Sequence, residues 1–158
     1  MKTLIVYDSF FGNTEKIALA IGKAFGNTKE VTICKAAEVT PDMLDGLDYL
    51  IVGSPTRAFS PSPATKSFLK GIPSNQLAGV KVTAFDTRIA MTDKMPGFLR
   101  FMGKLFGYAD KPILDILKKN GGQEIAPSKG FFVLDSEGPL EKGEIERAVV
   151  WVKQIKKA

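Results

Sequence analysis

The sequence predicts a doubly wound α/β domain, in which helices cover both faces of a five-stranded parallel sheet. Short apolar runs alternate along the whole chain with segments whose apolar residues recur every three or four positions. Two of the helical segments begin at a Thr-Pro or Ser-Pro pair, which supplies an N-cap and a first-turn proline. No repeat, low-complexity stretch or linker breaks the alternation, so 158 residues are expected to form a single domain, 1–158.

The first half of the chain carries three of the expected strands. Four consecutive apolar residues at 4–7 indicate a strand that is covered on both faces. Gly26 stands where a left-handed cap would end the first helix, and the alternating polarity of 29–34 is typical of an edge strand. In order, the expected elements are a strand over 2–7, a helix over 13–25, a strand over 29–34, a short helix from Thr40-Pro41-Asp42 and a strand over 47–53.

The second half continues the pattern with two strands and three helical segments. In the segment 94–108 the apolar residues fall on one face, which predicts a helix that covers the sheet. The alternative for this face is a hydrophobic lid, or a docking surface for a quinone, a partner or a membrane. The expected elements are a helix over 63–70 capped by Ser62, a strand over 80–86, helix over 94–120 broken near Gly107 and restarted at Lys111-Pro112, a strand over 130–134, and a helix over 141–156 with Ile145, Ala148, Val149, Val152 and Ile155 inward.

The composition excludes several kinds of chemistry. Cys34 is the only cysteine and the chain has no histidine, which rules out an internal disulfide, a cysteine metal cluster and imidazole metal sites. Ser-His-Asp and Cys-His catalysis are ruled out as well. Redox or transfer chemistry is therefore expected to come mainly from a bound organic cofactor, with no metal and no catalytic side chain to name.

Charge and hydropathy indicate a soluble, cytoplasmic protein. Lys and Arg exceed Asp and Glu by 22 − 17 = 5, but the basic residues are dispersed rather than interleaved with aromatic ones. A solvated basic surface is therefore favoured over nucleic-acid binding. No apolar run approaches the ~18 residues of a membrane span, and the start of the chain lacks a signal-peptide pattern, so no stable membrane insertion is expected.

Three loops are expected to leave the carboxyl ends of strands, at 8–14, 54–62 and 86–93. Ligands of open α/β sheets bind at this edge. In the first loop the side chains of Ser9, Asn13 and Thr14 can donate hydrogen bonds. Gly12 lets the backbone come close, and the following helix presents unpaired N–H groups. We therefore expect a phosphate to bind here through hydroxyls and backbone; the alternative is a polar helix cap.

The position of this loop between a strand and a helix, rather than its residue types alone, predicts the phosphate site. The tripeptide Gly-Asn-Thr recurs at Gly26-Asn27-Thr28, where it follows a helix and has no free helix N-terminus to offer. The chain has no G-x-x-x-x-G-K-[ST] and no G-x-G-x-x-G after its first strand. A response-regulator receiver would need an aspartate at the end of the third strand, where Gly53-Ser54-Pro55 stands.

These loops resemble those of flavodoxins. Ser9-Phe10-Phe11-Gly12-Asn13-Thr14-Glu15 is similar to the phosphate signature Ser-x-Thr-Gly-Asn-Thr-Glu, and Gly53-Ser54-Pro55-Thr56-Arg57 is similar to the second flavin loop. The stretch from Gly121-Gly122 through Phe131-Phe132 to the last helix resembles the closing unit of short-chain flavodoxins. The resemblance implies a flavodoxin-like, three-layer α/β/α fold with strand order 2-1-3-4-5. Flavodoxin itself is a known example of this order, with FMN where the order reverses.

The resemblance implies FMN as the cofactor and electron transfer as the function. Ser9, Gly12, Asn13 and Thr14 would hold the phosphate, and the second and third loops would flank the isoalloxazine. Of the two phenylalanines, one is expected to pack under the loop against the rim of the sheet, and the other to edge the flavin. The implied cofactor-binding residues are Ser9, Phe10, Phe11, Gly12, Asn13 and Thr14; Ser54, Pro55, Thr56, Arg57, Ala58 and Phe59; and Asp86, Thr87 and Arg88.

Three features depart from the flavodoxin pattern. The only tryptophan, Trp151, lies in the last helix and is expected to pack in the core, so the second loop offers Phe59 in place of the usual Trp–Tyr sandwich. The chain is basic whereas flavodoxins are usually acidic, which implies a less negative potential if Arg57 or Arg88 lies near the ring, and an acidic redox partner. Phe11 stands where a hydroxyl residue usually precedes the glycine.

Three functions stay open at this point. An FMN-dependent electron carrier is favoured over a turnover enzyme, and it predicts a stable semiquinone without NAD(P)H oxidation. Flavodoxin-like quinone reductases of the tryptophan-repressor-binding-protein type tolerate an aromatic residue at the position of Phe11 and share the Pro55-Thr56-Arg57 tripeptide, and this reading predicts NAD(P)H-dependent turnover with a quinone. The third reading is a flavodoxin-fold binding module without flavin, which would stay colourless when FMN is added.

Overall fold

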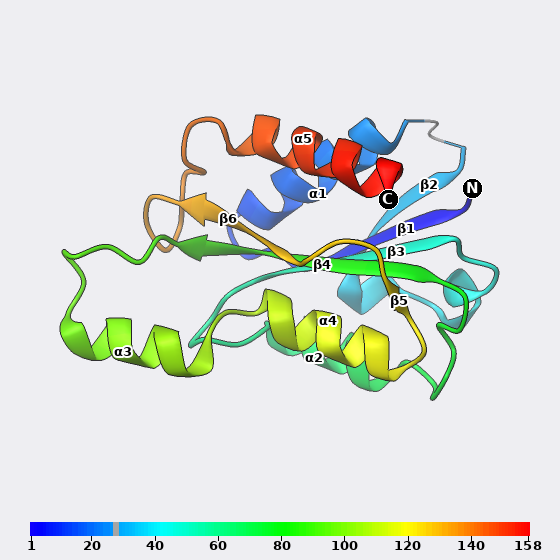
Figure 1. Cartoon of the computed structure of the whole chain (residues 1–158), viewed down its shortest axis with the longest axis horizontal. Helices are drawn as coiled ribbons and strands as arrows, with labels where there is room; N and C mark the ends of the chain where they lie inside the picture. Colours follow the sequence, from blue (N-terminus) through cyan, green and yellow to red (C-terminus); the bar gives the residue numbers. More distant parts are fainter. Residues whose placement is uncertain (27–28) are drawn as a thin grey trace.

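Strands and helices alternate along the chain as the sequence predicts (Figure 1). The structure, a computed structural model, describes residues 1–26 and 29–158, so positions 27 and 28 of the second Gly-Asn-Thr lie outside the described residues. The elements are β1 (Thr3–Tyr7), α1 (Asn13–Phe25), β2 (Val31–Lys35), the 3₁₀ turns η1 (Ala36–Glu38) and η2 (Pro41–Leu44), β3 (Tyr49–Pro55), α2 (Pro63–Lys70), β4 (Lys81–Ile89), α3 (Gly97–Phe106), α4 (Asp110–Lys119), β5 (Gln123–Glu124), β6 (Lys129–Val133) and α5 (Glu144–Lys157).

All strands of the sheet run parallel in the order β2-β1-β3-β4-β5, which confirms the predicted order 2-1-3-4-5. β2 lies at the edge, as its alternating polarity indicated. The fifth position is divided between two strands, which was not predicted: β5 pairs with the start of β4 and β6 with its end. Between β5 and β6, Pro127 has no N–H group to donate to a neighbouring strand. The carbonyl of Ala126 accepts a hydrogen bond from the Thr83 hydroxyl at 3.0 Å instead of from a strand backbone.

The helices cover the sheet from both sides, with α1 and α5 on one face and α2 and α4 on the other (Figure 1). Each face has its own apolar core, because the strands are buried on both sides. Trp151 lies in the core beneath α5, with its ring 6.4 Å from that of Phe85 and 6.0 Å from that of Phe131. The expectation that Trp151 is a packing residue is therefore confirmed.

Two details of the predicted elements are wrong. β4 runs on to Ile89 instead of ending at residue 86, because its last five residues pair with β6. Asp86, Thr87 and Arg88 therefore belong to a strand rather than to a loop. Ile145 was expected to face inward but is exposed; Glu144 is buried in its place, and its carboxylate accepts a hydrogen bond from the Phe132 N–H at 2.7 Å.

The helical segment 94–120 is broken at Gly107, as predicted, but its first part does not cover the sheet as expected. Gly107 ends α3 with a φ of 69°, a left-handed conformation that suits glycine. α4 covers the sheet, whereas α3 is set apart from it, at the end to which the arrows of β4 and β6 point (Figure 1). Within the described part of the chain, no helix combines the length and the apolar character needed to cross a membrane.

Candidate functional site

The loop after β1 folds into a cradle at the start of α1. The Ser9 hydroxyl accepts hydrogen bonds from the N–H groups of Gly12 at 3.1 Å and Glu15 at 3.4 Å. Gly12 has a φ of 90°, and its carbonyl accepts the first bond of the helix, from the Lys16 N–H at 3.1 Å. Among the described residues, no acceptor meets the N–H groups of Asn13 or Thr14. The cradle can therefore offer an anion two backbone donors and the positive end of the helix dipole.

The side chains at the start of α1 are held by the neighbouring loops. The Asn13 amide donates to the Glu137 carbonyl at 3.1 Å, in the loop after β6. The hydroxyls of Thr14 and Thr87 lie 2.7 Å apart and share one hydrogen bond, which joins α1 to β4. Because only one of the two hydroxyl hydrogens can lie between them, the other can point to a ligand.

Arg57 covers the two phenylalanines of the first loop. Its guanidinium carbon lies 4.8 Å from the centre of the Phe10 ring and 5.4 Å from that of Phe11, both within cation–π range. Both rings are exposed, so neither packs under the loop against the rim of the sheet, and that expectation is wrong. The rings instead form a platform for a cation that comes from the second loop.

The second loop is a tight hairpin from Arg57 to Ser60. The two residues exchange backbone hydrogen bonds at 2.9 and 3.0 Å. The turn residues Ala58 and Phe59 have φ angles of 47° and 62°, which cost a side-chain-bearing residue about 1–2 kcal/mol each. Ser54 is buried below the hairpin, where its hydroxyl accepts a hydrogen bond from the Ser62 N–H at 2.9 Å and donates one to the Pro55 carbonyl.

Asp86 and Arg88, predicted to border the flavin ring, form a buried ion-pair cluster on the α4 side of β4. Arg88 donates to both oxygens of Asp86, at 2.7 and 2.8 Å, and its Nη2 lies 3.0 Å from Asp110. Burial raises the pKa of Asp86 to about 7, although the hydrogen bond and the charge of Arg88 oppose the shift. The Arg88 guanidinium also lies 3.7 Å from the centre of the Tyr108 ring.

These loops enclose a small pocket of about 80 Å³ at the carboxyl edge of the sheet. Its polar lining consists of five hydroxyl side chains, one amide and two guanidinium groups, without a carboxylate. Such a donor set suits an anion. The pocket residues are Ser9, Phe10, Phe11, Asn13, Thr14, Pro55, Thr56, Arg57, Thr87, Arg88, Ile89, Val133 and Ser136. The space has room for a phosphate group, whereas whole cofactors need about 300–1,000 Å³, so the ring of a flavin would lie outside it.

The structure brings most of the sequence-predicted site residues together. Ten of the fifteen line the pocket. The five that do not line it are Gly12, Ser54, Ala58, Phe59 and Asp86. Sequence reasoning missed Ile89, Val133 and Ser136. The rule that ligands meet the carboxyl ends of neighbouring strands could have found Val133 and Ser136, because they end and follow the strand beside β4.

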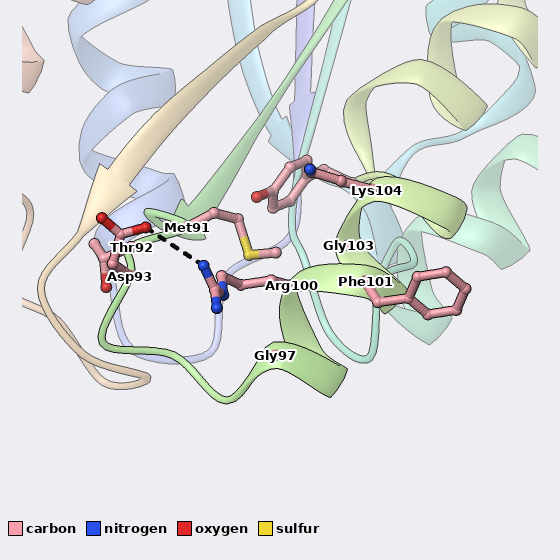
Figure 2. Close-up of a pocket in the computed structure, with 9 residues that line it drawn as sticks. Met91, Thr92, Asp93, Gly97, Arg100, Phe101, Gly103 and Lys104 are labelled. Carbon is pink, nitrogen blue, oxygen red and sulfur yellow. Dashed lines mark hydrogen bonds and ion pairs between the residues drawn. The ribbon is translucent and has the colours of Figure 1, made fainter.

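A second, larger pocket of about 630 Å³ lies between the loop after β4 and α3. Figure 2 shows Arg100 reaching from α3 across this pocket towards Asp93, which it meets at 3.4 Å, while Phe101, which also lines the pocket, directs its ring away from Arg100. Met91 lies against Gly103 of α3. The two pockets share a wall, because Arg88 lines the small one and stacks on Tyr108, which lines the large one.

No protein-family model matches this chain. Its structure is nevertheless similar over 99% of its length to several solved proteins. A flavodoxin from the domain Archaea matches with a TM-score of 0.76, 21% identity and 97% of its own chain covered. Flavodoxin 2 from Bacillus cereus matches with a TM-score of 0.78 and 21% identity, and 99% of its chain is covered. A flavodoxin, WrbA-like protein from Agrobacterium tumefaciens matches with a TM-score of 0.68 and 18% identity, and 95% of its chain is covered. At these identities the likeness establishes the flavodoxin-like fold.

Proposed function

Starting from the flavodoxin-like fold of this chain, we propose that it binds FMN and transfers electrons. One observation carries the proposal: the small pocket combines the free N-terminus of α1, five hydroxyls and two arginines, and lacks a carboxylate. It lies at the sheet edge where ligands of this strand order bind. Several structural neighbours are flavodoxins, which supports a flavin as the occupant.

The chain's own residues would hold and tune the cofactor. The N–H groups of Asn13 and Thr14 and the shared hydroxyls of Thr14 and Thr87 would bind the phosphate. FMN, when bound, supplies the chemistry of accepting and donating electrons. The charge of Arg88 is balanced by two carboxylates, so Arg57, which is exposed and faces only aromatic rings, would attract a reduced, anionic ring more strongly.

The visible spectrum of the purified protein with excess FMN tests this proposal. We expect a yellow complex, quenching of flavin fluorescence, and a stable semiquinone during reductive titration. The potential is expected to be less negative than that of a typical acidic flavodoxin, and a partner protein to be acidic. A protein that stays colourless and leaves flavin fluorescence unchanged would instead be a binding module without flavin.

Two glycines offer a matched pair of variants for the phosphate site. Gly12 and Gly143 precede α1 and α5, both have a φ of 90°, and a Cβ added to either meets nothing within 4 Å. Gly12→Ala and Gly143→Ala should therefore cost similar stability, about 1–2 kcal/mol. Only Gly12→Ala adds a methyl group at the cradle, so only that variant should weaken FMN binding. Equal loss of FMN in both variants would contradict the assignment.

NAD(P)H-dependent quinone reduction is the second candidate function. The larger pocket favours it, because about 630 Å³ beside the anion pocket is enough for a second substrate. The WrbA-like neighbour is consistent with this reading. Oxidation of NADH or NADPH by the FMN-loaded protein, measured at 340 nm with and without a benzoquinone, separates the two functions. Turnover supports the quinone reductase. Absence of turnover together with a stable semiquinone supports the electron carrier.

A further inference from the structure

α3 exposes its apolar side chains instead of burying them. Phe98 is 69% exposed, Phe101 61% and Leu105 62%, while Gly103 is the only buried residue of the helix. The attachment of α3 to the body is slight in the described structure: Met91 and Phe59 lie against Gly103, and the rings of Phe59 and Phe106 are 6.4 Å apart.

The orientation of α3 is the reverse of that found in an ordinary surface helix. At 3.6 residues per turn Phe98, Phe101 and Leu105 share one side, and Arg100 falls opposite them. Arg100, Gly103 and Lys104 line the large pocket together with Phe101, whereas Phe98 and Leu105 lie outside its lining. Figure 2 shows the Phe101 ring directed away from Arg100, so the polar side faces the protein and most of the apolar side faces outward. In water this arrangement is unfavourable unless something covers the apolar side.

The same end of the molecule collects half of the other exposed large apolar residues. α3, the loop after β1 and the loop after β6 all lie at the carboxyl edge of the sheet (Figure 1). Nine of the thirteen exposed large apolar residues of the described chain belong to this end; they are Phe10, Phe11, Ile89, Phe98, Leu99, Phe101, Leu105, Phe106 and Leu134. We call this set the apolar cap.

Positive charge accompanies α3, whereas the loop after β6, which carries Leu134, also exposes Asp135 and Glu137. α3 contains no Asp or Glu, and Lys94 and Lys104 are exposed beside it. Asp93 and Asp110, the acidic residues nearest to α3 in sequence, pair with Arg100 and Arg88. Arg57 adds an exposed cation above the rings of Phe10 and Phe11. Exposed phenylalanines and leucines flanked by lysines are the pattern of helices that lie in the interface of an anionic membrane.

We propose that α3 docks this protein onto an anionic lipid surface, with Phe98, Phe101 and Leu105 in the interfacial layer and the nearby lysines at the headgroups. The proposal goes beyond flavin binding and does not depend on it. A second copy of the chain fits less well. α3 has ten residues and is about 15 Å long, and one projecting helix of that length covers less than the ~800 Å² per partner that a stable dimer buries.

Sedimentation with vesicles tests the proposal on the full chain. The wild type should bind phosphatidylcholine vesicles that contain phosphatidylglycerol, bind pure phosphatidylcholine vesicles at least about tenfold less, and be released by salt. The double variant Phe98→Ser/Leu105→Ser should lose at least about tenfold of the binding to anionic vesicles. The matched control is Leu19→Ser/Val150→Ser, whose wild-type side chains are 50% and 53% exposed on α1 and α5; it should bind like the wild type.

Circular dichroism and light scattering complete the test. All variants should keep the far-ultraviolet spectrum of the wild type, because the replaced side chains are exposed. The proposal is overturned if the wild type does not bind anionic vesicles, or if both double variants bind equally. It is also overturned, in favour of a second copy of the chain as the occupant, if the wild type is a dimer that Phe98→Ser/Leu105→Ser converts to a monomer and vesicle binding is absent.

Discussion

Gly53 allows the close approach of β3 to the Phe85 ring, and its replacement by alanine should destabilise the protein strongly. A Cβ at Gly53 would lie 2.0 Å from Cζ of Phe85 and within 2.4 Å of both Cε atoms. The ring cannot retreat, since Phe85 is fully buried and meets Phe131 and Trp151 at 6.2 and 6.4 Å between ring centres. Overpacking typically costs about 1–3 kcal/mol, and we expect Gly53→Ala to reach about 3 kcal/mol.

Urea unfolding measures the change in the free energy of unfolding. The fluorescence of Trp151, the only tryptophan, follows the transition, and its ring lies beside that of Phe85. Gly97→Ala is the control, because its Cβ would meet nothing closer than the Arg100 guanidinium at 4.0 Å; its stability should change by less than about 0.5 kcal/mol. Phe85→Leu removes the clashing ring atoms, so Gly53→Ala/Phe85→Leu should be more stable than the sum of the single effects predicts, by about 1 kcal/mol or more. Strict additivity, or a Gly53→Ala variant as stable as the wild type, would refute the reasoning.

Three further predictions concern the loops and the buried ion-pair cluster. Ala58→Gly should raise the free energy of unfolding by about 0.5–1 kcal/mol, measured in urea, because glycine adopts a φ of 47° without strain; a less stable variant would show that the turn is not strained. Phe11→Thr places a hydroxyl beside the cradle, and fluorescence titration should show FMN binding up to about tenfold tighter; weaker binding would mean that the Arg57 platform holds the cofactor. The folded pKa of Asp86, about 7, lies above its unfolded value of about 3.9. The free energy of unfolding should therefore fall as pH rises from about 4 to about 7, by up to about 1.4 kcal/mol per pH unit, and level off above 7; the fall should be less steep in Asp86→Asn. Equal pH profiles of the two proteins would disprove this linkage.

The outline of the site follows from local sequence signals. A strand that ends at Tyr7, a glycine and a helix start place a candidate anion cradle at 9–14, and the parallel alternation brings the loop after β3 beside it. The roles within the cradle do not follow so simply. Asn13 and Thr14 were expected to give their side chains to a ligand, and both side chains also bond to distant segments, at Glu137 and Thr87. Such pairings depend on how far each strand extends, which no local pattern reports.

The sequence by itself determined the parallel sheet, its order by resemblance, the core position of Trp151 and the place of the candidate anion cradle, because these depend on periodicity and on residues adjacent in the chain. Tertiary structure alone decided that β4 runs to Ile89, that Asp86 and Arg88 neutralise each other, and that the apolar side of α3 faces outward. The physical reason is the same in each case. Periodicity shows which side chains share a face, whereas the direction of that face depends on whether another element is there to cover it.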